Sequence, residues 1–256
     1  MTSHTQDPSL SFVAPCRILT PSAPWHWIRL GWIDLRAAPV QSLSYGAGVA
    51  LLSAVVLGVG IRYGTGWTVL MLLSGFVFIA PVLVMGLYTI SSALSAGQRP
   101  SLRACLRLTR HALADALVYS LILMVICLLW IRAGSAVEIF FPEESEPSRA
   151  TLLAFLAIGS ATGSVFALVA FAASAFSLPM IADRRVDAVT AVVTSINAVL
   201  RNRRAMAVWV ALIVLSVVVG VALAVVGLAV TMPLIAHSTW HGYRETIDSA
   251  SWPRRE

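Results

Sequence analysis

Five apolar stretches, each long enough to cross a lipid bilayer as a helix, constrain this chain more than any other feature. A helix needs about 20 predominantly apolar residues to cross ~30 Å of hydrocarbon. The stretches are Ser42–Ile61, Trp67–Leu94, Leu113–Ile131, Thr151–Ile181 and Ala205–Ala236. Of the 256 residues, 58% are apolar and only 12% are charged, whereas about 25% of a soluble domain is charged. The sequence therefore predicts an all-α fold, a polytopic transmembrane helical bundle embedded in lipid.

The last stretch, Ala205–Ala236, leaves the number of spans at five or six. Its 32 residues carry no charge, which is long for one span and short for two, and a tight turn near Gly220 would divide it. All 18 basic residues are arginine, and basic residues gather on the cytoplasmic side of membrane proteins. Six spans place 15 of these arginines in the cytoplasm, whereas five spans place 12 there. The distribution favours six spans with both termini cytoplasmic.

Three regions follow from this topology. Residues 1–24 contain four prolines and no charge-then-apolar pattern of a cleaved signal, and we expect a flexible cytoplasmic tail there. Residues 25–244 form the predicted integral membrane helical domain, and residues 245–256 a second cytoplasmic tail. The three cysteines show no pairing pattern, which is typical of a reduced, cytosol-facing setting. The expected location is the bacterial inner membrane, crossed several times.

Amphipathic stretches precede some of the predicted spans. In the stretch 25–36 a helix would place Trp25, Ile28, Trp32 and Leu35 on one face, and in 100–108 Ser101 would be an N-cap. Helices of this kind lie in the headgroup plane of a membrane with arginine toward anionic lipid. Packing of the same helices on the cytoplasmic side of the bundle is the alternative.

An internal repeat is the second organising hypothesis. The segments Leu35–Tyr45, Thr109–Tyr119 and Leu200–Val210 align without gaps, and in each an amphipathic stretch and an arginine precede an apolar span. Pro81, Pro179 and Pro233 recur late in the descending helices. The predicted unit is an amphipathic helix, a span up and a span down, used three times.

Ionisable residues are missing from the middle of the predicted spans, which argues against a proton pump because such groups mark function inside a membrane. Asp115 lies at the start of the third span, spaced i,i+4 from His111. Histidines 26, 111, 237 and 241 map to the cytoplasmic interface. Because His237 and His241 are also spaced i,i+4, they could bind a metal or haem; an interfacial aromatic cluster with Trp240 and Tyr243 is the favoured interpretation.

Other motifs are weak. Gly159 and Gly163 form a GxxxG pattern in the fourth span, where small residues let helices approach closely, within the molecule or between two copies. The sequence contains no recognisable Ser/His/Asp arrangement, phosphate-binding loop or nucleic-acid stripe. We therefore predict no catalytic, cofactor-binding or metal-binding residue and no nucleic-acid partner.

The chain as a whole resembles an uncharacterised family of bacterial multi-span membrane proteins. The motifs that carry the resemblance are Trp32–Arg36 with Pro39 and Ser42, Gly86–Tyr88, Ser177–Met180, Asp187–Ala191 and His237–Arg244. Some members are labelled as cytochrome c oxidase subunits, which implies haem and copper ligation. The chain lacks the intramembrane histidines that this chemistry requires, so the label is not carried over.

These observations favour a non-enzymatic accessory or scaffold protein of the inner membrane that contacts lipid, other membrane proteins or a second copy of itself. Two alternatives remain at this level. The first is a transporter or channel for a small or lipid-like solute, which would need no buried charge. The second is a haem-binding or metal-binding accessory protein of a respiratory chain that uses His237 and His241.

Overall fold

The computed structural model describes residues 12–64, 83–140 and 148–255, and these residues are helical almost throughout. The helices are α1 (Ala23–Ala37), α2 (Pro39–Tyr63), α4 (Leu102–His111), α5 (Leu113–Phe140), α6 (Arg149–Ser174), α7 (Ser177–Asp183), α8 (Ala188–Arg201), α9 (Arg203–Ala222) and α10 (Leu228–Thr246). An unlabelled apolar helix, Leu83–Ser95, precedes α4. The described residues contain no strand, only two isolated bridges. The all-α prediction is confirmed.

Four helices are long and apolar enough to cross a membrane. They are Pro39–Tyr63, Leu113–Val137, Arg149–Asp183, which joins α6 to α7, and Arg203–Ala222. They correspond to the first, third and fourth predicted spans and to the beginning of the fifth stretch. Most of the predicted span Trp67–Leu94 lies outside the described residues, and so does Pro81; the helix Leu83–Ser95 is its described end.

The long apolar stretch Ala205–Ala236 is divided between α9 and α10. The division lies at residues 223–227, close to the predicted turn near Gly220, and Ala224 and Val225 adopt positive φ angles of 54° and 68° there. Gly220 itself lies near the end of α9. A Cβ atom there would lie 2.5 Å from the Leu228 side chain, so this glycine allows the start of α10 to fold back against α9.

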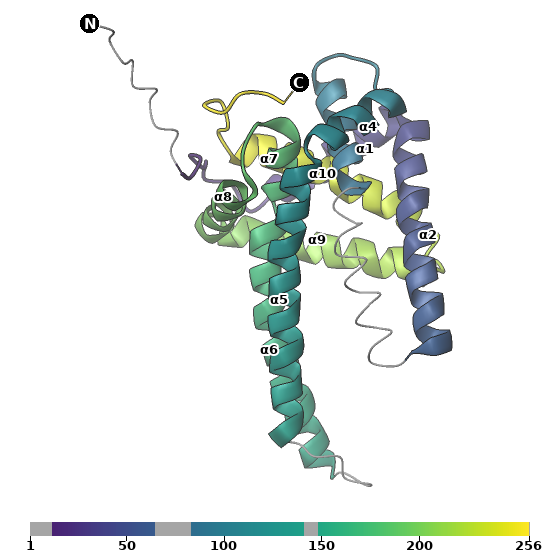
Figure 1. Ribbon diagram of the computed structural model, residues 1–256, viewed down its shortest axis with the longest axis vertical. Helices are drawn as coiled ribbons and strands as arrows, with labels where there is room; N and C mark the ends of the chain where they lie inside the picture. Colours follow the sequence, from purple (N-terminus) through teal and green to yellow (C-terminus); the bar gives the residue numbers. More distant parts are fainter. Residues whose placement is uncertain (1–11, 65–82, 141–147, 256) are drawn as a thin grey trace, which may run out of the picture.

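The long helices do not share one direction. Helices α5 and α6 pack as a pair that extends away from the rest of the molecule, and α2 points in roughly the same direction in Figure 1. Helix α9 lies across this direction (Figure 1). Helix α10 contacts α1, α2, α7 and α9 and is therefore the central element.

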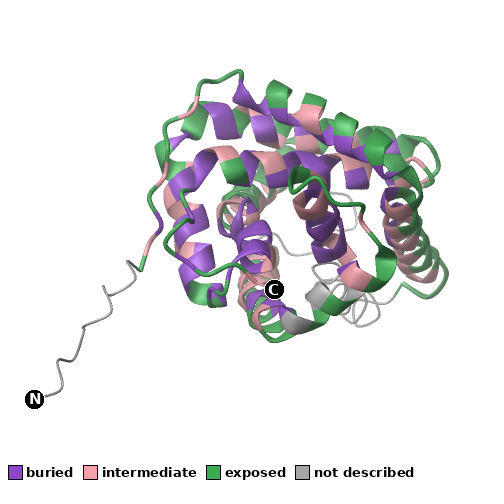
Figure 2. Ribbon diagram, turned by 90° about the horizontal axis from the view of Figure 1, so that it is seen from above, coloured by how far each residue is buried: buried purple, intermediate pink, exposed green. Residues whose placement is uncertain are grey.

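Aromatic side chains fill the core around α10. The Trp27 ring packs edge-on against Trp209 and Phe176, with ring centroids 5.5 and 6.1 Å apart, a geometry that aromatic pairs prefer. Trp240 and Tyr243 of α10 are also buried. Seen from above, buried residues lie on the facing sides of the helices and exposed residues on the outside (Figure 2). The predicted interfacial belt of Trp240 and Tyr243 is thus wrong, because both rings pack inside the protein.

Helix α1 packs on the bundle through a face that differs from the predicted one. Trp27, Gly31 and Asp34 are buried against α10, whereas Trp25 and Trp32 are exposed. Hydrophobic periodicity misplaced this face because its centre is a glycine and an aspartate. A Cβ atom on Gly31 would lie 2.7 Å from Ser238 N, so only glycine permits this approach of α1 to α10. The exposed Trp25 and Trp32 remain available for the membrane interface.

The predicted tails are partly packed on the helices. Residues 1–11 lie outside the described residues, but Ala14 is buried and the Arg17 amide donates to Thr246 O at 2.8 Å. At the other end, Trp252 is buried and the Arg185 amide donates to Pro253 O at 2.9 Å. Residues 12–24 therefore differ from the predicted flexible tail, and residues 245–255 are likewise hydrogen-bonded to the helical domain.

Two local motifs had different outcomes. The Ser101 hydroxyl accepts a hydrogen bond from the Ala104 amide at 3.2 Å, which confirms the predicted N-cap before α4. In the GxxxG pattern, a Cβ atom on Gly163 would lie 3.6 Å from Trp130 Nε1, but one on Gly159 would meet open space. Within the described residues, only the second glycine faces a neighbouring helix.

Candidate functional site

A chain of buried hydrogen bonds joins four helices, and we call its members the His237 cluster. The members are Asp34 of α1, Ser42 of α2, Ser91 of the helix Leu83–Ser95, and His237 and His241 of α10. Ser42 Oγ lies 2.9 Å from His237 Nε2, and Ser91 Oγ lies 2.7 Å from His237 Nδ1. Asp34 Oδ2 accepts from Ser91 Oγ at 2.7 Å and lies 2.9 Å from His241 Nε2.

The hydrogen bonds of the His237 cluster define the proton positions. Ser91 donates its only hydrogen to Asp34 and must therefore accept one from His237 Nδ1. His237 Nε2 is then an acceptor, and the Ser42 hydroxyl donates to it. With one nitrogen donating and the other accepting, the His237 ring is neutral in this arrangement.

The order of groups in the cluster is a hydroxyl, an imidazole and, through a second hydroxyl, a carboxylate. The cluster differs from a Ser/His/Asp triad, because Ser91 stands between the imidazole of His237 and the carboxylate of Asp34. Such an order can activate a serine nucleophile. Ser42 is, however, fully buried, and no member of the cluster lines any of the three cavities described below. Within the described residues the cluster therefore connects four helices, and its serine oxygen is not exposed.

His237 and His241 are connected through hydrogen bonds to Ser91 and Asp34, and they do not face a common metal position. Both ring nitrogens of His237 are used by serines, and His241 Nε2 is directed at the Asp34 carboxylate. Among the described residues no group of three His, Cys, Asp or Glu side chains is placed to hold a metal ion. His26 is exposed on α1, and the side chain of His111 lies outside the described part of the chain.

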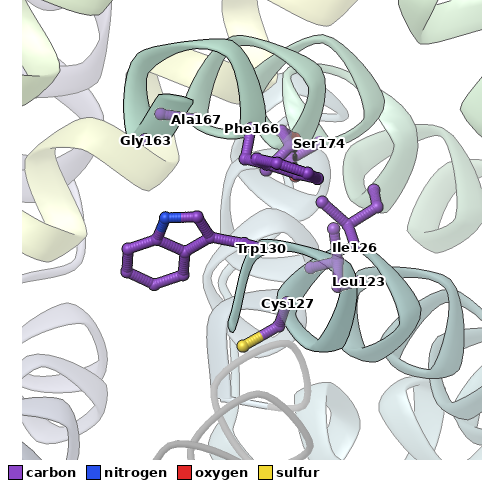
Figure 3. Close-up of a pocket in the computed structure, with 9 residues that line it drawn as sticks. Leu123, Ile126, Cys127, Trp130, Gly163, Phe166, Ala167 and Ser174 are labelled. Carbon is purple, nitrogen blue, oxygen red and sulfur yellow. Dashed lines mark hydrogen bonds between the residues drawn. The ribbon is translucent and has the colours of Figure 1, made fainter. Parts of the chain in front are cut away.

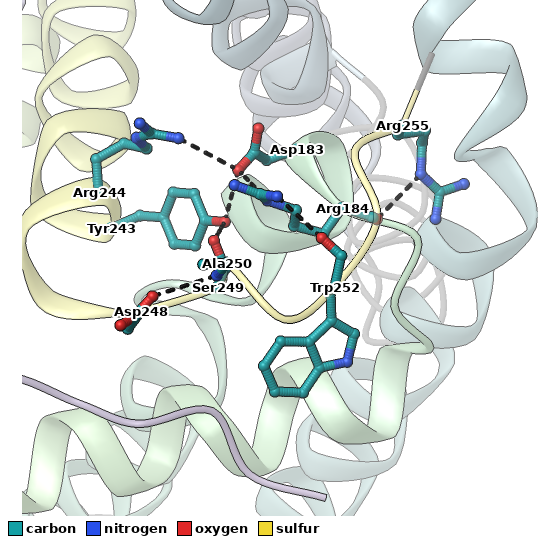
Figure 4. Close-up of polar contacts among 9 residues, drawn as sticks. All are labelled: Asp183, Arg184, Tyr243, Arg244, Asp248, Ser249, Ala250, Trp252 and Arg255. Atoms are coloured by element: carbon teal, nitrogen blue, oxygen red, sulfur yellow. Dashed lines mark hydrogen bonds and ion pairs between the residues drawn. The ribbon is translucent and has the colours of Figure 1, made fainter. Parts of the chain in front are cut away.

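A second polar cluster fastens the C-terminal segment, and Figure 4 shows it around Asp183. Asp183 Oδ2 accepts from Tyr243 Oη at 2.8 Å and from Arg184 Nε at 2.9 Å. Arg184 Nη1 in turn donates to Trp252 O at 2.9 Å. The cluster ties α7, α10 and the segment after α10 together.

Asp115, which the sequence pairs with His111, has a different partner. Its Oδ2 atom lies 2.6 Å from Arg255 Nη2, so this carboxylate joins the start of α5 to the C-terminal segment. The contact spans 140 positions of the sequence. Only the fold brings these two groups together, and local spacing could not reveal the pairing.

Three cavities lie between described helices. One of about 290 Å³ lies between α5 and α6, and Figure 3 shows Trp130, Phe166 and Ile126 around it with the Cys127 thiol. A larger one, about 680 Å³, lies between α6, α8 and α9. The third, about 470 Å³, lies where the N-terminal segment meets the junction of α8 and α9. The first two cavities are lined mainly by apolar side chains.

Helices α5 and α6 carry a large exposed apolar surface. Leu121, Val125, Leu128 and Leu129 of α5 and Leu152, Leu153, Leu156, Val165, Leu168 and Val169 of α6 are exposed. A monomeric soluble protein rarely exposes a contiguous apolar patch larger than a few hundred Å². Together with the length of these helices, this surface fits a hydrocarbon environment.

Comparison with known proteins agrees with a membrane protein. Residues 69–183 match the family described as predicted integral membrane protein (DUF2189), and the match covers a little under half of the chain. No curated protein and no solved structure matches the chain. Over residues 69–183 the chain is therefore similar to a family of predicted integral membrane proteins, which confirms the resemblance found in the sequence.

Proposed function

We propose that this chain is a non-enzymatic, six-span protein of the bacterial inner membrane with both termini in the cytoplasm. It acts as a scaffold or accessory component that contacts lipid and either another membrane protein or a second copy of itself. The His237 cluster holds its helices together, and the exposed faces of α5 and α6 form the contact surface.

The single observation that carries this proposal is that the members of the His237 cluster are hydrogen-bonded to one another. The imidazole of His237, the carboxylate of Asp34 and the hydroxyls of Ser42 and Ser91 bind one another. A catalytic site built on these groups would need at least one of them to face a substrate. Fully satisfied buried networks rigidify a core, which is what a scaffold requires.

The three-unit arrangement is supported by the places where helices break. Each of the three aligned segments crosses a junction between an amphipathic helix and a long apolar helix. The junctions are Ala38 between α1 and α2, Ala112 between α4 and α5, and Asn202 between α8 and α9. In the alignment Ala38 and Ala112 coincide, and Asn202 is displaced by one position. Together with the arginine distribution, this supports an up-and-down pair of spans in each unit.

Photocrosslinking from within the membrane tests the scaffold proposal. A photoreactive amino acid replaces Leu128 or Leu156, which are exposed on α5 and α6, and the buried Met180 serves as the matched control. We expect a discrete protein adduct, to another membrane protein or to a second copy, from at least one exposed position and none from Met180. Adducts to lipid alone at every exposed position of α5 and α6 would contradict the proposal.

Chemical labelling of the purified protein tests the proposal that the chain is not an enzyme. A fluorophosphonate probe labels serines that an imidazole activates for nucleophilic attack. Because Ser42 is fully buried, we expect no labelling of this residue in the folded protein. Labelling at Ser42 that disappears in His237→Gln would show an activated nucleophile and overturn this part of the proposal.

A further inference from the structure

Two cavities adjoin at the junction of α8 and α9, and we call them together the α8–α9 groove. The apolar part, about 680 Å³, is lined by Leu168 and Phe171 of α6, Val199 of α8, and Met206 and Val210 of α9. The polar part, about 470 Å³, is lined by Arg201, Arg203 and Arg204 and by residues of the N-terminal segment. The two parts share Leu200 and Arg203. Volumes of this size are typical of sites for small organic molecules.

The polar part of the groove carries an excess of positive charge. Arg201, Arg203 and Arg204 are exposed, and none of the four ion pairs found among the described residues includes them. Arg203 Nε donates to Leu200 O, which adds no negative charge. A fourth arginine, Arg17, is close by, because its carbonyl accepts from Asn202 Nδ2 at 3.0 Å. The positive end of the α9 dipole lies at the same place.

The groove has the polarity order of a phospholipid. Arg201 ends α8, and Arg203 and Arg204 begin α9. The apolar lining continues to Val210, seven residues or about 10 Å further along α9 than Arg203. An anionic headgroup pairs with arginine through charge-assisted hydrogen bonds. An acyl chain that fills an apolar cavity removes apolar surface from water, which is favourable. Each half of one lipid molecule therefore has a matching part of the groove.

We propose that the α8–α9 groove binds one anionic phospholipid, with its phosphate on Arg201, Arg203 and Arg204 and an acyl chain between Phe171, Val199, Met206 and Val210. This inference goes beyond the scaffold function, since a scaffold needs no specific lipid. An acidic peptide or a free phosphate would use the arginines but would leave the apolar cavity without a role.

Native mass spectrometry of the full-length protein in detergent tests the site. Phosphatidylglycerol and phosphatidylcholine with identical acyl chains are titrated separately onto the delipidated protein. We expect one phosphatidylglycerol molecule to bind at concentrations where phosphatidylcholine does not. Arg203→Gln with Arg204→Gln is expected to weaken this binding about 30-fold, the factor that corresponds to about 1 kcal/mol for each arginine near an anionic lipid.

Two further variants separate this site from general attraction between arginine and lipid. Arg103→Gln with Arg107→Gln removes the same charge from exposed positions of α4, and we expect binding to change less than about threefold. Ala207→Trp fills the apolar cavity, which Ala207 lines, and leaves all arginines in place. We expect this variant to lose phosphatidylglycerol binding at least tenfold while its unfolding temperature stays near that of the unaltered protein.

Three results would overturn the proposal. Equal losses in the α4 and α9 arginine variants would show non-specific surface attraction. Unchanged binding in Ala207→Trp, or displacement of phosphatidylglycerol by millimolar inorganic phosphate, would show a site for phosphate alone. An Ala207→Trp variant that unfolds is replaced by Ala172→Leu, which fills the same cavity from α6, and the same criterion applies. None of these results bears on protein crosslinks from α5 or α6, so the scaffold proposal is judged separately.

Discussion

His237 has two hydrogen-bonding nitrogens, and both are used inside the protein. Its Nδ1 lies 2.7 Å from Ser91 Oγ, its Nε2 lies 2.9 Å from Ser42 Oγ, and its side chain is fully buried. A charged imidazolium in this place would have to donate from both nitrogens, although Ser42 is the donor at Nε2. Burial of the ring adds the cost of desolvating a charge. The neutral ring is thus part of the folded state.

Stability is expected to fall as acid protonates His237. Protonation would end the hydrogen bond that His237 Nε2 accepts from Ser42 and would place a charge in a fully buried site. The contribution of the neutral ring to stability is therefore present at neutral pH and is lost as the pH falls. Thermal unfolding in detergent between pH 4 and 7 measures it. His237→Gln should flatten this dependence, and the exposed His26→Gln should not. An equally steep dependence in His237→Gln would contradict the assignment.

Helices were predictable from the sequence where the signal is local. The Ser101 N-cap, the long apolar runs of α2, α5 and α6, and the amphipathic start at residue 25 all depend on residues within a few turns of one another. The His237 cluster could not be predicted in this way, because Ser42 and His237 are 195 positions apart. The buried face of α1 was missed because its centre, Gly31, carries no hydrophobic signal.

Gly31 tests the packing of α1 on α10. Gly31→Ala would bring a Cβ atom within 2.9 Å of Leu234 O and 2.7 Å of Ser238 N, both backbone atoms that cannot move aside. Overpacking of this kind costs about 1–3 kcal/mol, and we expect a lower unfolding temperature. Gly159→Ala is the matched control, since its Cβ meets open space and alanine favours a helix by about 1 kcal/mol. Equal unfolding temperatures of the two variants would show that α1 does not pack this way.

At the scale of the whole molecule, the proposed six-span topology differs from the arrangement of the helices in the direction of α9. Six spans require α9 and α10 to cross the bilayer as a pair with the turn at 223–227 in the periplasm. Helix α9 lies across the direction of α5 and α6 in the structure (Figure 1), so its orientation is not part of the support for six spans. The arginine pattern and the three junctions support six spans. Five spans would place the same turn inside the hydrocarbon.

Chemical labelling of the turn between α9 and α10 tests this central claim most directly. A protein with Cys16, Cys105 and Cys127 replaced by alanine receives a single cysteine at Val226, whose side chain is 72% exposed. Six spans predict that a membrane-impermeant maleimide labels Val226→Cys in intact cells, whereas the matched Gln98→Cys variant is labelled only after the cells are opened. A Val226→Cys protein that stays unlabelled in intact cells, while Gln98→Cys behaves as expected, would contradict the six-span account.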